Sequence, residues 1–363
     1  MIPKKPRLLT GDTPTGKLHL GHWVGSLENR VGMQHSYDCY FILANMHAFT
    51  TRATQSKEIR QNVLDITLDY LAAGIDPTLS TIFIQSEIPA IAELTFLFSM
   101  LIPYPRLMRN PTLKDEIRDK DLGASYPFGF LLYPVGQVAD ILAFRADAVP
   151  VGEDQLPHLE LAQEVARRFG QLYNGVDPHT LDKDYVEAGG LFPIFQAILG
   201  RTRRLVGLGG PGKNGQLLKM SKSLNNAILL SDDNDTVHKK VMSIYTDPNR
   251  IRASDPGKVE NNPLWIFHDT FNPDKQWVEE TKQLYREGKI GDVVCKKKLV
   301  EVIVALLEPM HARRKLYQHN EDQLIKILKE GTERANSVAE ETLSEVKKAI
   351  NQQYFSRLLT FKG

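Results

Sequence analysis

Short apolar runs that alternate with helical patterns constrain the fold of the first 230 residues more than any other feature of this sequence. Strand-like runs occupy residues 8–10, 40–43 and 81–84, and the second and third are rich in β-branched or aromatic side chains. Between these two runs, apolar residues recur every three or four positions from residue 59 to residue 70. Strands that alternate with helices predict a parallel sheet covered by helices, which is an α/β fold.

Two helices of this region have recognisable ends. We expect the first to have Ser56 as its N-cap and to end at Gly74, since Pro77 prevents its continuation. The second is expected from about Gln155 to Phe169, and the basic residues in its last turn are favourable to the helix dipole.

The pattern changes near residue 232. No convincing strand follows, and helical periodicity dominates, for example at residues 300–307 and 324–328. A chain of 363 residues is long enough for two domains, so we expect the α/β domain to be followed by an all-helical one. Between them, residues 207–215 are rich in glycine and are expected to form a mobile loop.

Composition excludes several classes of protein. No apolar run approaches the roughly 20 residues of a membrane-spanning helix, and the N-terminus lacks a signal-peptide core. The only cysteines, Cys39 and Cys295, cannot form a disulfide framework or a zinc site by themselves. We therefore expect a cytoplasmic protein without a structural metal. Basic clusters at residues 201–204, 296–298 and 313–315 are interpreted as solvated helix faces.

The turn after the first predicted strand, residues 11–22, is rich in glycine and small hydroxyl side chains. The unpaired N–H groups at the start of the following helix, together with its dipole, attract anions. His19 and His22 lie in its first turn, where both can donate hydrogen bonds to phosphate oxygens. Gly21 leaves room for the close approach of a flat ring. The pattern predicts a phosphate site, with a pair of metal ligands or of surface histidines as alternatives.

A second basic element occupies residues 219–223, Lys-Met-Ser-Lys-Ser. Lys219 and Lys222 flank a serine beside the glycine-rich segment, which suits a loop that closes over a polyphosphate. Residues 207–213 also fit the spacing of a P-loop, but Asn214 stands where such a loop needs the Ser or Thr that binds magnesium. No strand directly precedes that segment either, so the P-loop interpretation is rejected.

In this order and spacing, residues 19–22 and 219–223 resemble the two signatures of class I aminoacyl-tRNA synthetases. Residues 133–142 and 149–161 further resemble tryptophanyl-tRNA synthetases of bacterial type, and the resemblance extends to about residue 245. It implies a Rossmann-type nucleotide-binding catalytic domain and a helical anticodon-binding domain. The implied bounds are 1–230 for the catalytic domain, about 90–150 for a dimerisation segment inserted in it, 231–345 for the helical domain, and 346–363 for a C-terminal helix that packs back on the catalytic domain.

The resemblance implies a ligase that activates L-tryptophan with ATP and Mg²⁺, releases pyrophosphate and transfers the amino acid to the 3′ end of tRNA(Trp). It also implies a homodimer without a membrane partner. The implied catalytic residues are His19, His22, Lys114, Lys219 and Lys222. The implied ATP contacts are Thr13, Pro14, Thr15, Gly21, His22, Gly152, Glu153, Asp154, Leu205, Lys219, Met220, Ser221, Lys222 and Ser223. The implied tryptophan contacts are His47, Tyr133, Gln137, Asp140 and Gln155.

Asp140 lies on an otherwise apolar helix, where a carboxylate without a partner is costly. An indole N–H is a donor only, so a carboxylate is a suitable acceptor for it. Pairing with Arg145 is the structural alternative. Gln137 and Asp140, three residues apart, also resemble the phenol-binding pair of the tyrosine-specific sister enzymes, whereas Gly-Glu-Asp-Gln at 152–155 favours tryptophan. A tyrosine–tRNA ligase, a small-molecule nucleotidyltransferase and an inactive RNA-binding paralogue are the alternative functions.

Overall fold

The computed structural model describes residues 5–119, 126–200, 205–212, 214–248, 250–252, 254–355, 357 and 359. Its centre is a five-stranded parallel sheet with the order β3-β2-β1-β4-β5. The strands are β1 (Arg7–Asp12), β2 (Asp38–Leu43), β3 (Ser80–Ile84), β4 (Ala148–Val151) and β5 (Gln196–Leu199). The strand order reverses between β1 and β4, which is where open α/β sheets bind ligands. The predicted Rossmann-type sheet is confirmed.

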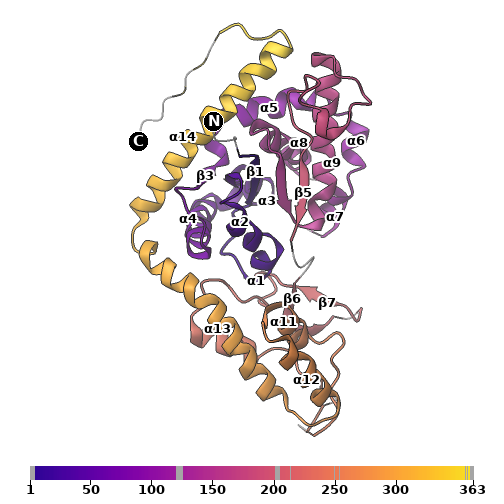
Figure 1. Cartoon of the computed structure of the whole chain (residues 1–363), viewed down its shortest axis with the longest axis vertical. Helices are drawn as coiled ribbons and strands as arrows, with labels where there is room; N and C mark the ends of the chain where they lie inside the picture. The colour runs from indigo at the N-terminus through magenta and orange to yellow at the C-terminus, as the bar shows by residue number, and fades with distance from the viewer. Residues whose placement is uncertain are drawn as a thin grey trace.

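Helices cover both faces of this sheet (Figure 1). They are α1 (Leu20–His22), α2 (Glu28–Met33), α3 (Asn45–Arg52), α4 (Ser56–Ala73), α5 (Pro89–Ser99), α6 (Tyr104–Met108), α7 (Pro111–Asp119), α8 (Phe128–Ala143) and α9 (Leu156–Phe169). Along β1, Leu8 and Leu9 point into two different hydrophobic clusters, because successive side chains of a strand face opposite sides. The α/β domain therefore has a core on each face of the sheet.

The predicted ends of α4 are correct to within one residue. Ser56 is the first helical residue, and Gln55 is the N-cap, whose side chain makes no capping bond. Gly74 ends the helix in the left-handed region, with φ of 114°, a conformation that glycine adopts without strain. The helix predicted from about Gln155 is α9, which ends at Phe169 as expected.

The segment expected to be a mobile loop forms a hairpin instead. Strands β6 (Val206–Pro211) and β7 (Leu217–Lys219) pair antiparallel. Its glycines permit close packing: a Cβ on Gly207 would lie 2.1 Å from Nδ2 of Asn226, and one on Gly210 2.3 Å from the ring of Tyr245. The prediction was wrong because glycine marks close approach as well as flexibility. Lys213, within that segment, lies outside the described residues.

Beyond residue 232, helices are the only regular elements in the described part of the chain, as expected. They are α10 (Asn234–Met242), α11 (Pro263–Phe271), α12 (Lys275–Arg286), α13 (Asp292–Tyr317) and α14 (Glu321–Ala349). The first four form the helical domain. None of the described helices is long and apolar enough to cross a membrane.

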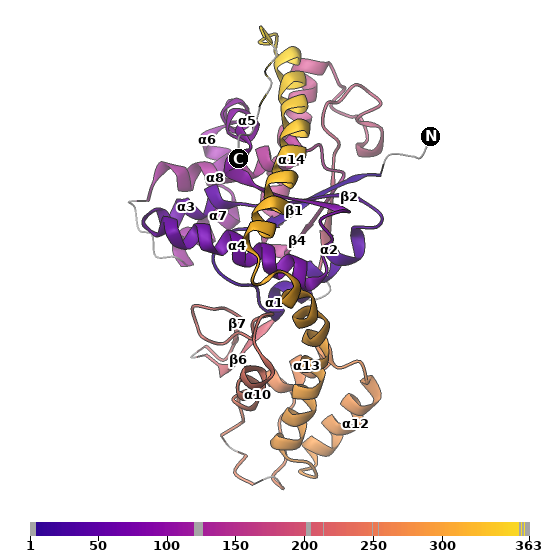
Figure 2. The same ribbon diagram turned by 90° about the vertical axis from the view of Figure 1, so that its left-hand side faces the viewer.

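Helix α14 extends from the helical domain and packs along β3 at the edge of the α/β domain (Figure 2). Its first apolar residues, Leu324 and Leu328, pack in one core, whereas Ala335, Leu343 and Val346 pack in the other. Helix α14 passes through the predicted boundary at 345, so the helix expected at 346–363 does not begin there. Residues 356, 358 and 360–363 of that segment lie outside the described residues. One continuous apolar stripe carries a single helix across both cores, and that helix ends at Ala349.

The interpretation of the basic clusters as solvated is also wrong for several of their members. The buried ammonium group of Lys296 donates hydrogen bonds to the carbonyls of Met242 and Ile244, at the end of α10. Arg313 caps the end of α4 through the carbonyl oxygens of Ala72 and Ala73. Basic side chains stabilise helix C-termini in this way. The cluster at 201–204 lies outside the described residues.

Candidate active site

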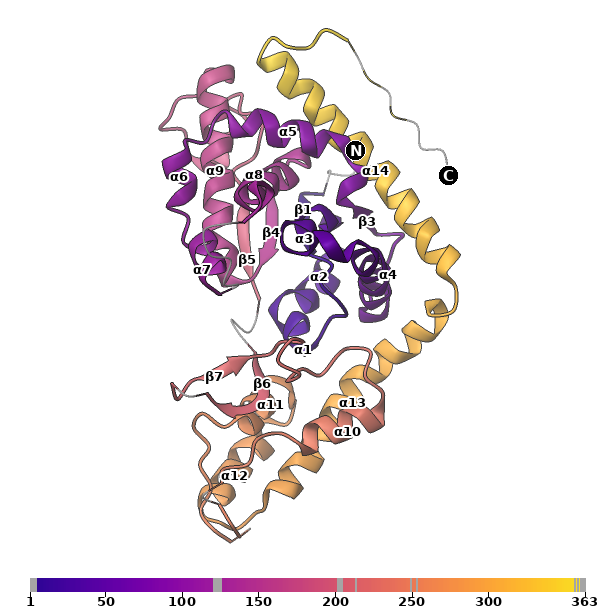
Figure 3. The same ribbon diagram turned by 180° about the vertical axis from the view of Figure 1, so that it is seen from behind.

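A cavity of about 970 Å³ opens at the carboxyl ends of β1 and β4. Figure 3 shows α1 at this end of the sheet, facing the β6–β7 hairpin. Most of the predicted site residues line the cavity: Thr13, Thr15, His19, Gly21, His22, His47, Tyr133, Gln137, Asp140, Gly152, Asp154, Gln155, Leu205, Lys219, Met220, Ser221, Lys222 and Ser223. Pro14, Lys114 and Glu153 do not line it; Pro14 is buried, and Lys114 and Glu153 are exposed on the surface.

The side chains of His19 and His22 form a capping box at the start of α1, in which each ring accepts a hydrogen bond from a backbone N–H group. Nδ1 of His19 accepts from the backbone N–H of Gly21 at 3.1 Å, and Nδ1 of His22 accepts from the backbone N–H of His19 at 3.1 Å. A neutral imidazole that accepts at Nδ1 carries its proton on Nε2. Each ring therefore presents an N–H donor on its far side, and the ring centroids are 3.8 Å apart.

Both histidines are neutral at physiological pH. Burial and the neighbouring His22 and lysines lower the pKa of His19 to about 2. Burial lowers the pKa of His22 to about 4, although the carboxylate of Asp12 opposes this shift. The pair is thus a set of two oriented neutral donors, and no third ligand needed by a metal site joins them among the described residues.

A buried cluster beneath this turn was missed by the sequence analysis. Asp12, the last residue of β1, accepts hydrogen bonds at 2.6 Å from both the Arg30 guanidinium and the Tyr70 hydroxyl. Burial alone would raise the pKa of Asp12, but Arg30 outweighs it and the pKa falls to about 2. A polar residue that ends a parallel strand was the available signal, because strand ends meet at the site.

The lysine loop is folded against the mouth of the cavity. Nζ of Lys222 donates to the backbone carbonyl of Lys17 at 3.0 Å and lies close to Gly16. Asn226 holds the loop from below, accepting from the N–H of Ser221 at 2.7 Å and donating to the carbonyl of Lys219 at 3.2 Å. Burial, followed by the charge of Arg52, lowers the pKa of Lys222 to about 8.

At the inner end of the cavity, Asp140 is 4% exposed and is held by a residue that the sequence analysis missed. Nε2 of Gln85 donates to both carboxylate oxygens of Asp140, at 2.8 and 2.9 Å. Nε2 of His47 lies 3.6 Å from the same carboxylate. Arg145 pairs with Glu345 at 2.9 Å, so the alternative pairing of Arg145 with Asp140 is wrong. Gln85 directly follows β3, which was the signal for it.

Burial raises the pKa of Asp140 to about 7, although the hydrogen bond from Gln85 lowers it. A folded-state pKa above the unfolded value makes folding less favourable as pH rises from about 4 to about 7, where the unfolded chain alone releases the proton. At pH 8 we expect the free energy of unfolding of Asp140→Asn to exceed that of the parent by an amount on the order of a few kcal/mol, so that the variant unfolds at a higher temperature. The difference should grow between pH 4 and 7 and then level off, as thermal unfolding across pH will show. A difference that does not vary with pH would contradict the assignment.

A second polar set lies further along α8 from Asp140. The hydroxyl of Tyr133 lies 3.1 Å from Nε2 of His158 and 3.2 Å from Glu116. Gln137 donates to Gln155 at 3.4 Å, so these two amides lie side by side. Glu116 and His158 were not predicted. This set can bind a charged amino group, whereas Asp140 and its partners can bind a lone N–H or O–H donor.

Comparison with known proteins agrees with this geometry. Residues 3–308 match the family described as tRNA synthetases class I (W and Y). The chain is 46% identical to the tryptophan–tRNA ligase of Clostridium longisporum, over 98% of this chain and 99% of that protein. It is 47% identical to that of Lactococcus lactis subsp. lactis, over 97% and 99%. A solved structure of the tryptophanyl-tRNA synthetase from Campylobacter jejuni, complexed with ADP and tryptophan, is similar with a TM-score of 0.78 and 29% identity, over 95% of this chain and 99% of that one.

Proposed function

This chain belongs to the class I tRNA synthetases for tryptophan and tyrosine, and we infer that within this family it is a tryptophan–tRNA ligase. It uses ATP to activate L-tryptophan and transfers the product to the 3′ end of tRNA(Trp). In the first step, a carboxylate oxygen bonds to the α-phosphorus while the bond to pyrophosphate breaks. One observation carries the assignment to this cavity: the buried Asp140–Gln85 pair lies at the inner end of a cavity whose mouth is lined by both signature motifs.

We propose that the signatures bind the phosphates. No protein nucleophile is required, so catalysis rests on positioning and on stabilising charge. The Nε2–H groups of His19 and His22 donate to phosphate oxygens, which their low pKa values and fixed tautomers favour. Lys219 and Lys222 follow the leaving pyrophosphate. The bond from Lys222 to the carbonyl of Lys17 is exchanged for one to a phosphate.

The inner cavity is proposed to bind tryptophan. Asp140 accepts the indole N–H, and His47 and Gln137 lie beside the ring. Tyr133 and Gln155 hold the α-amino group, supported by the nearby carboxylates of Glu116 and Asp154. The carboxyl group is then directed toward the mouth, where the phosphates bind.

The remaining ATP contacts are proposed along the strand ends and the two loops: Thr13, Thr15, Gly21, Gly152, Asp154, Leu205, Met220, Ser221 and Ser223. At Gly152, a Cβ would lie 2.7 Å from Oδ1 of Asp154, so glycine keeps this carboxylate beside the backbone, where a ribose can reach both. Pro14, Lys114 and Glu153 stay predictions. We propose that Mg²⁺ enters as part of the substrate, bound to the ATP phosphates.

The partners beyond the small substrates are proposed from the surface. We propose that the domain formed by α10–α13 reads the anticodon through unpaired bases. Exposed apolar side chains on neighbouring helices of the predicted dimerisation segment support a homodimer: Phe96, Met100, Tyr104 and Phe128 are each more than 60% exposed. The cytoplasm is the proposed location.

ATP–pyrophosphate exchange measured with each of the standard amino acids tests the function. We expect exchange with tryptophan and little with tyrosine or phenylalanine. Preferential exchange with tyrosine would overturn the choice between the two specificities of the family, and absence of exchange with every amino acid would contradict an activating enzyme. Charging of tRNA(Trp) then tests the second step.

A further inference from the structure

Helix α14 makes hydrogen bonds to the chain just before and just after Gln85, the residue that donates to Asp140. Gln85 begins the short turn Gln85–Glu87 at the end of β3. Immediately before it, the backbone N–H of Ile84 donates to Oγ1 of Thr332 at 3.3 Å. Two residues after it, the carbonyl of Glu87 accepts from Nδ2 of Asn336 at 2.7 Å. Both contacts come from one face of α14, since the two residues are four apart.

The contact between α14 and this segment is close and buried. Thr332 and Asn336 are 4% and 3% exposed. A Cβ on Gly331 would lie 1.9 Å from the carbonyl oxygen of Ile82, so the helix backbone lies directly against the edge strand. Arg334 adds a hydrogen bond to the carbonyl of Pro77 at 3.3 Å. An edge strand covered in this way has little freedom to shift.

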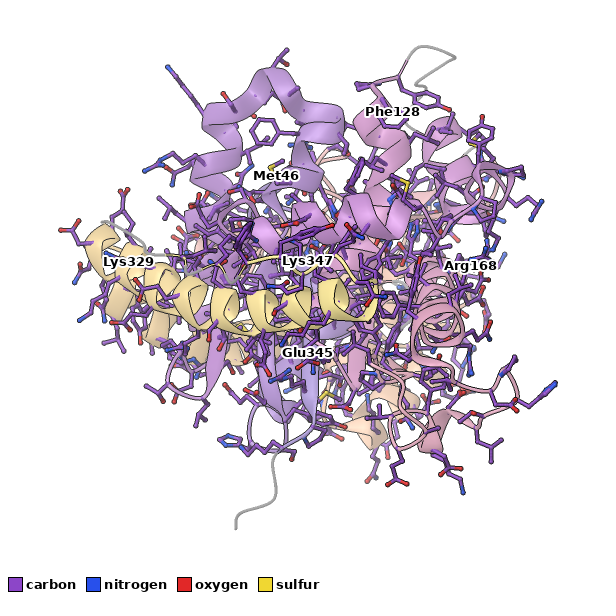
Figure 4. All side chains as sticks on the ribbon, turned by 90° about the horizontal axis from the view of Figure 1, so that it is seen from above. Met46, Phe128, Arg168, Lys329, Glu345 and Lys347 are labelled. Carbon is purple, nitrogen blue, oxygen red and sulfur yellow. The ribbon has the colours of Figure 1, made fainter. Side chains whose placement is uncertain are left out.

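The far half of the helix is fixed to the catalytic domain by ion pairs. Figure 4 shows α14 across the catalytic domain, with Lys329 toward one end and Glu345 and Lys347 toward the other. Glu345 pairs with Arg145, and Lys347 with Glu93. These ion pairs fix α14 to the α/β domain beyond the turns that contact Ile84 and Glu87.

Gln85 connects the segment held by α14 to the proposed substrate pocket, because its side chain forms hydrogen bonds to three groups there. Its side-chain oxygen accepts from the backbone N–H groups of Met46 and His47, at 3.1 and 3.4 Å. Its nitrogen donates to both oxygens of Asp140. Gln85 has a single direction in which all of these bonds form, so a displaced backbone at the end of β3 turns the amide away from the carboxylate.

We propose that Thr332 and Asn336 are positioning residues for tryptophan selection, which act through Gln85 on the carboxylate of Asp140. The inference rests on the proposed role of Asp140 in binding the indole. Neither residue touches the cavity, so neither is catalytic. Their effect falls on tryptophan and not on the phosphate-binding signatures. The first signature is held by α4, where Asp69 accepts from the N–H of Leu18, and the second is held by Asn226.

A double-mutant cycle tests the proposal. Thr332→Val removes the acceptor at nearly constant volume, and we expect it to raise KM for tryptophan in exchange by about 3- to 10-fold, with kcat and KM for ATP little changed. Asn336→Ala removes the second anchor independently and should act in the same way. In the Gln85→Ala background, Thr332→Val should have no further effect, because the connection is already broken.

The chain offers a matched control on the same helix. Thr342 is 1% exposed, and its hydroxyl donates to the carbonyl of Val338, within α14, at 3.1 Å. Thr342→Val should lose a similar amount of stability and leave KM for tryptophan unchanged. Thr332→Ser keeps the hydroxyl and should restore the parent KM. Thermal unfolding of each variant separates local from global effects.

The pH dependence of kcat/KM for tryptophan distinguishes a positioning role from a merely structural one. The hydrogen bond from Gln85 lowers the pKa of Asp140, so its loss should shift the rise of kcat/KM for tryptophan to higher pH. Among the other titratable groups of this cavity, His47 has a pKa of about 4, and burial raises that of Tyr133, with Glu116 adding to the rise. These two groups stay neutral between pH 6 and 9. Lys222 at the mouth has a pKa of about 8 and titrates in this range in the parent and the variants alike, so the shift between them is the readout.

The outcomes are distinct. An unchanged KM in both Thr332→Val and Asn336→Ala, or an equal increase with and without Gln85, would overturn the proposal while the role of Asp140 stands. If Asp140→Ala also leaves tryptophan binding unchanged, the role of Asp140 fails and the inference fails with it.

Discussion

Replacing Lys222 by alanine is expected to slow ATP–pyrophosphate exchange by about two to three orders of magnitude, with little change in the affinity for tryptophan. The ammonium group lies at the cavity mouth, against Gly16 and the carbonyl of Lys17. A neutral carbonyl is a weaker partner than a leaving pyrophosphate, so the interaction strengthens as negative charge develops. A contact of that kind lowers the barrier and not the dissociation constant of the ground state.

Lys17→Ala is the matched control for this change. It removes one positive charge from the same turn, but the carbonyl that Lys222 contacts belongs to the backbone and is retained. The side chain of Lys17 is exposed and does not line the cavity. Single-turnover measurement of adenylate formation separates the chemical step from product release. An unaltered exchange rate for Lys222→Ala would remove this lysine from the mechanism.

Asp140→Ala is expected to abolish discrimination between tryptophan and phenylalanine. The pocket would lose the acceptor for the indole N–H, and a hydrogen bond to a charged group contributes about 1.5–3 kcal/mol, or roughly 10- to 150-fold in kcat/KM. The amide of Gln85, now without its carboxylate, would add the cost of an unpaired buried donor.

Exchange kinetics with tryptophan, phenylalanine and tyrosine measure this effect, and KM for ATP serves as the internal control because Asp140 lies at the inner end of the cavity. Retained selectivity for tryptophan over phenylalanine would refute the assignment of Asp140. A gain for tyrosine would instead point to Gln137, which lies on the same helix next to Gln155.

Local sequence patterns were sufficient for three of the five strands of the sheet and for the ends of two of its helices. The apolar runs predicted β1, β2 and β3, because a buried parallel strand requires such runs wherever it lies in the sheet. The ends of α4 and α9 followed from Gly74, Pro77 and the basic last turn. The hairpin β6–β7 could not be predicted, since its strands are short and its glycines serve contacts with residues distant in sequence.

The two signature motifs could likewise be located from the sequence, because each is contiguous, and the structure brings them to one cavity. His19 and His22 are three apart and pair through the backbone between them. By contrast, Asp12, Arg30 and Tyr70 come from three elements and meet only when the sheet and α4 are assembled. No local spacing connects them, so their cluster was missed.

By itself, the sequence determined a parallel sheet through its alternation of strands with helices, and its two contiguous motifs predicted a phosphate site. What only the tertiary structure decided is how the amino-acid end of the cavity is held. Gln85 and Asp140 are 55 residues apart, and the anchors Thr332 and Asn336 lie 248 and 249 residues beyond Ile84 and Glu87, the residues they contact. The physical reason is that short-range patterns encode helices, strands and caps, whereas a buried carboxylate must find its hydrogen-bond partners wherever the fold brings them.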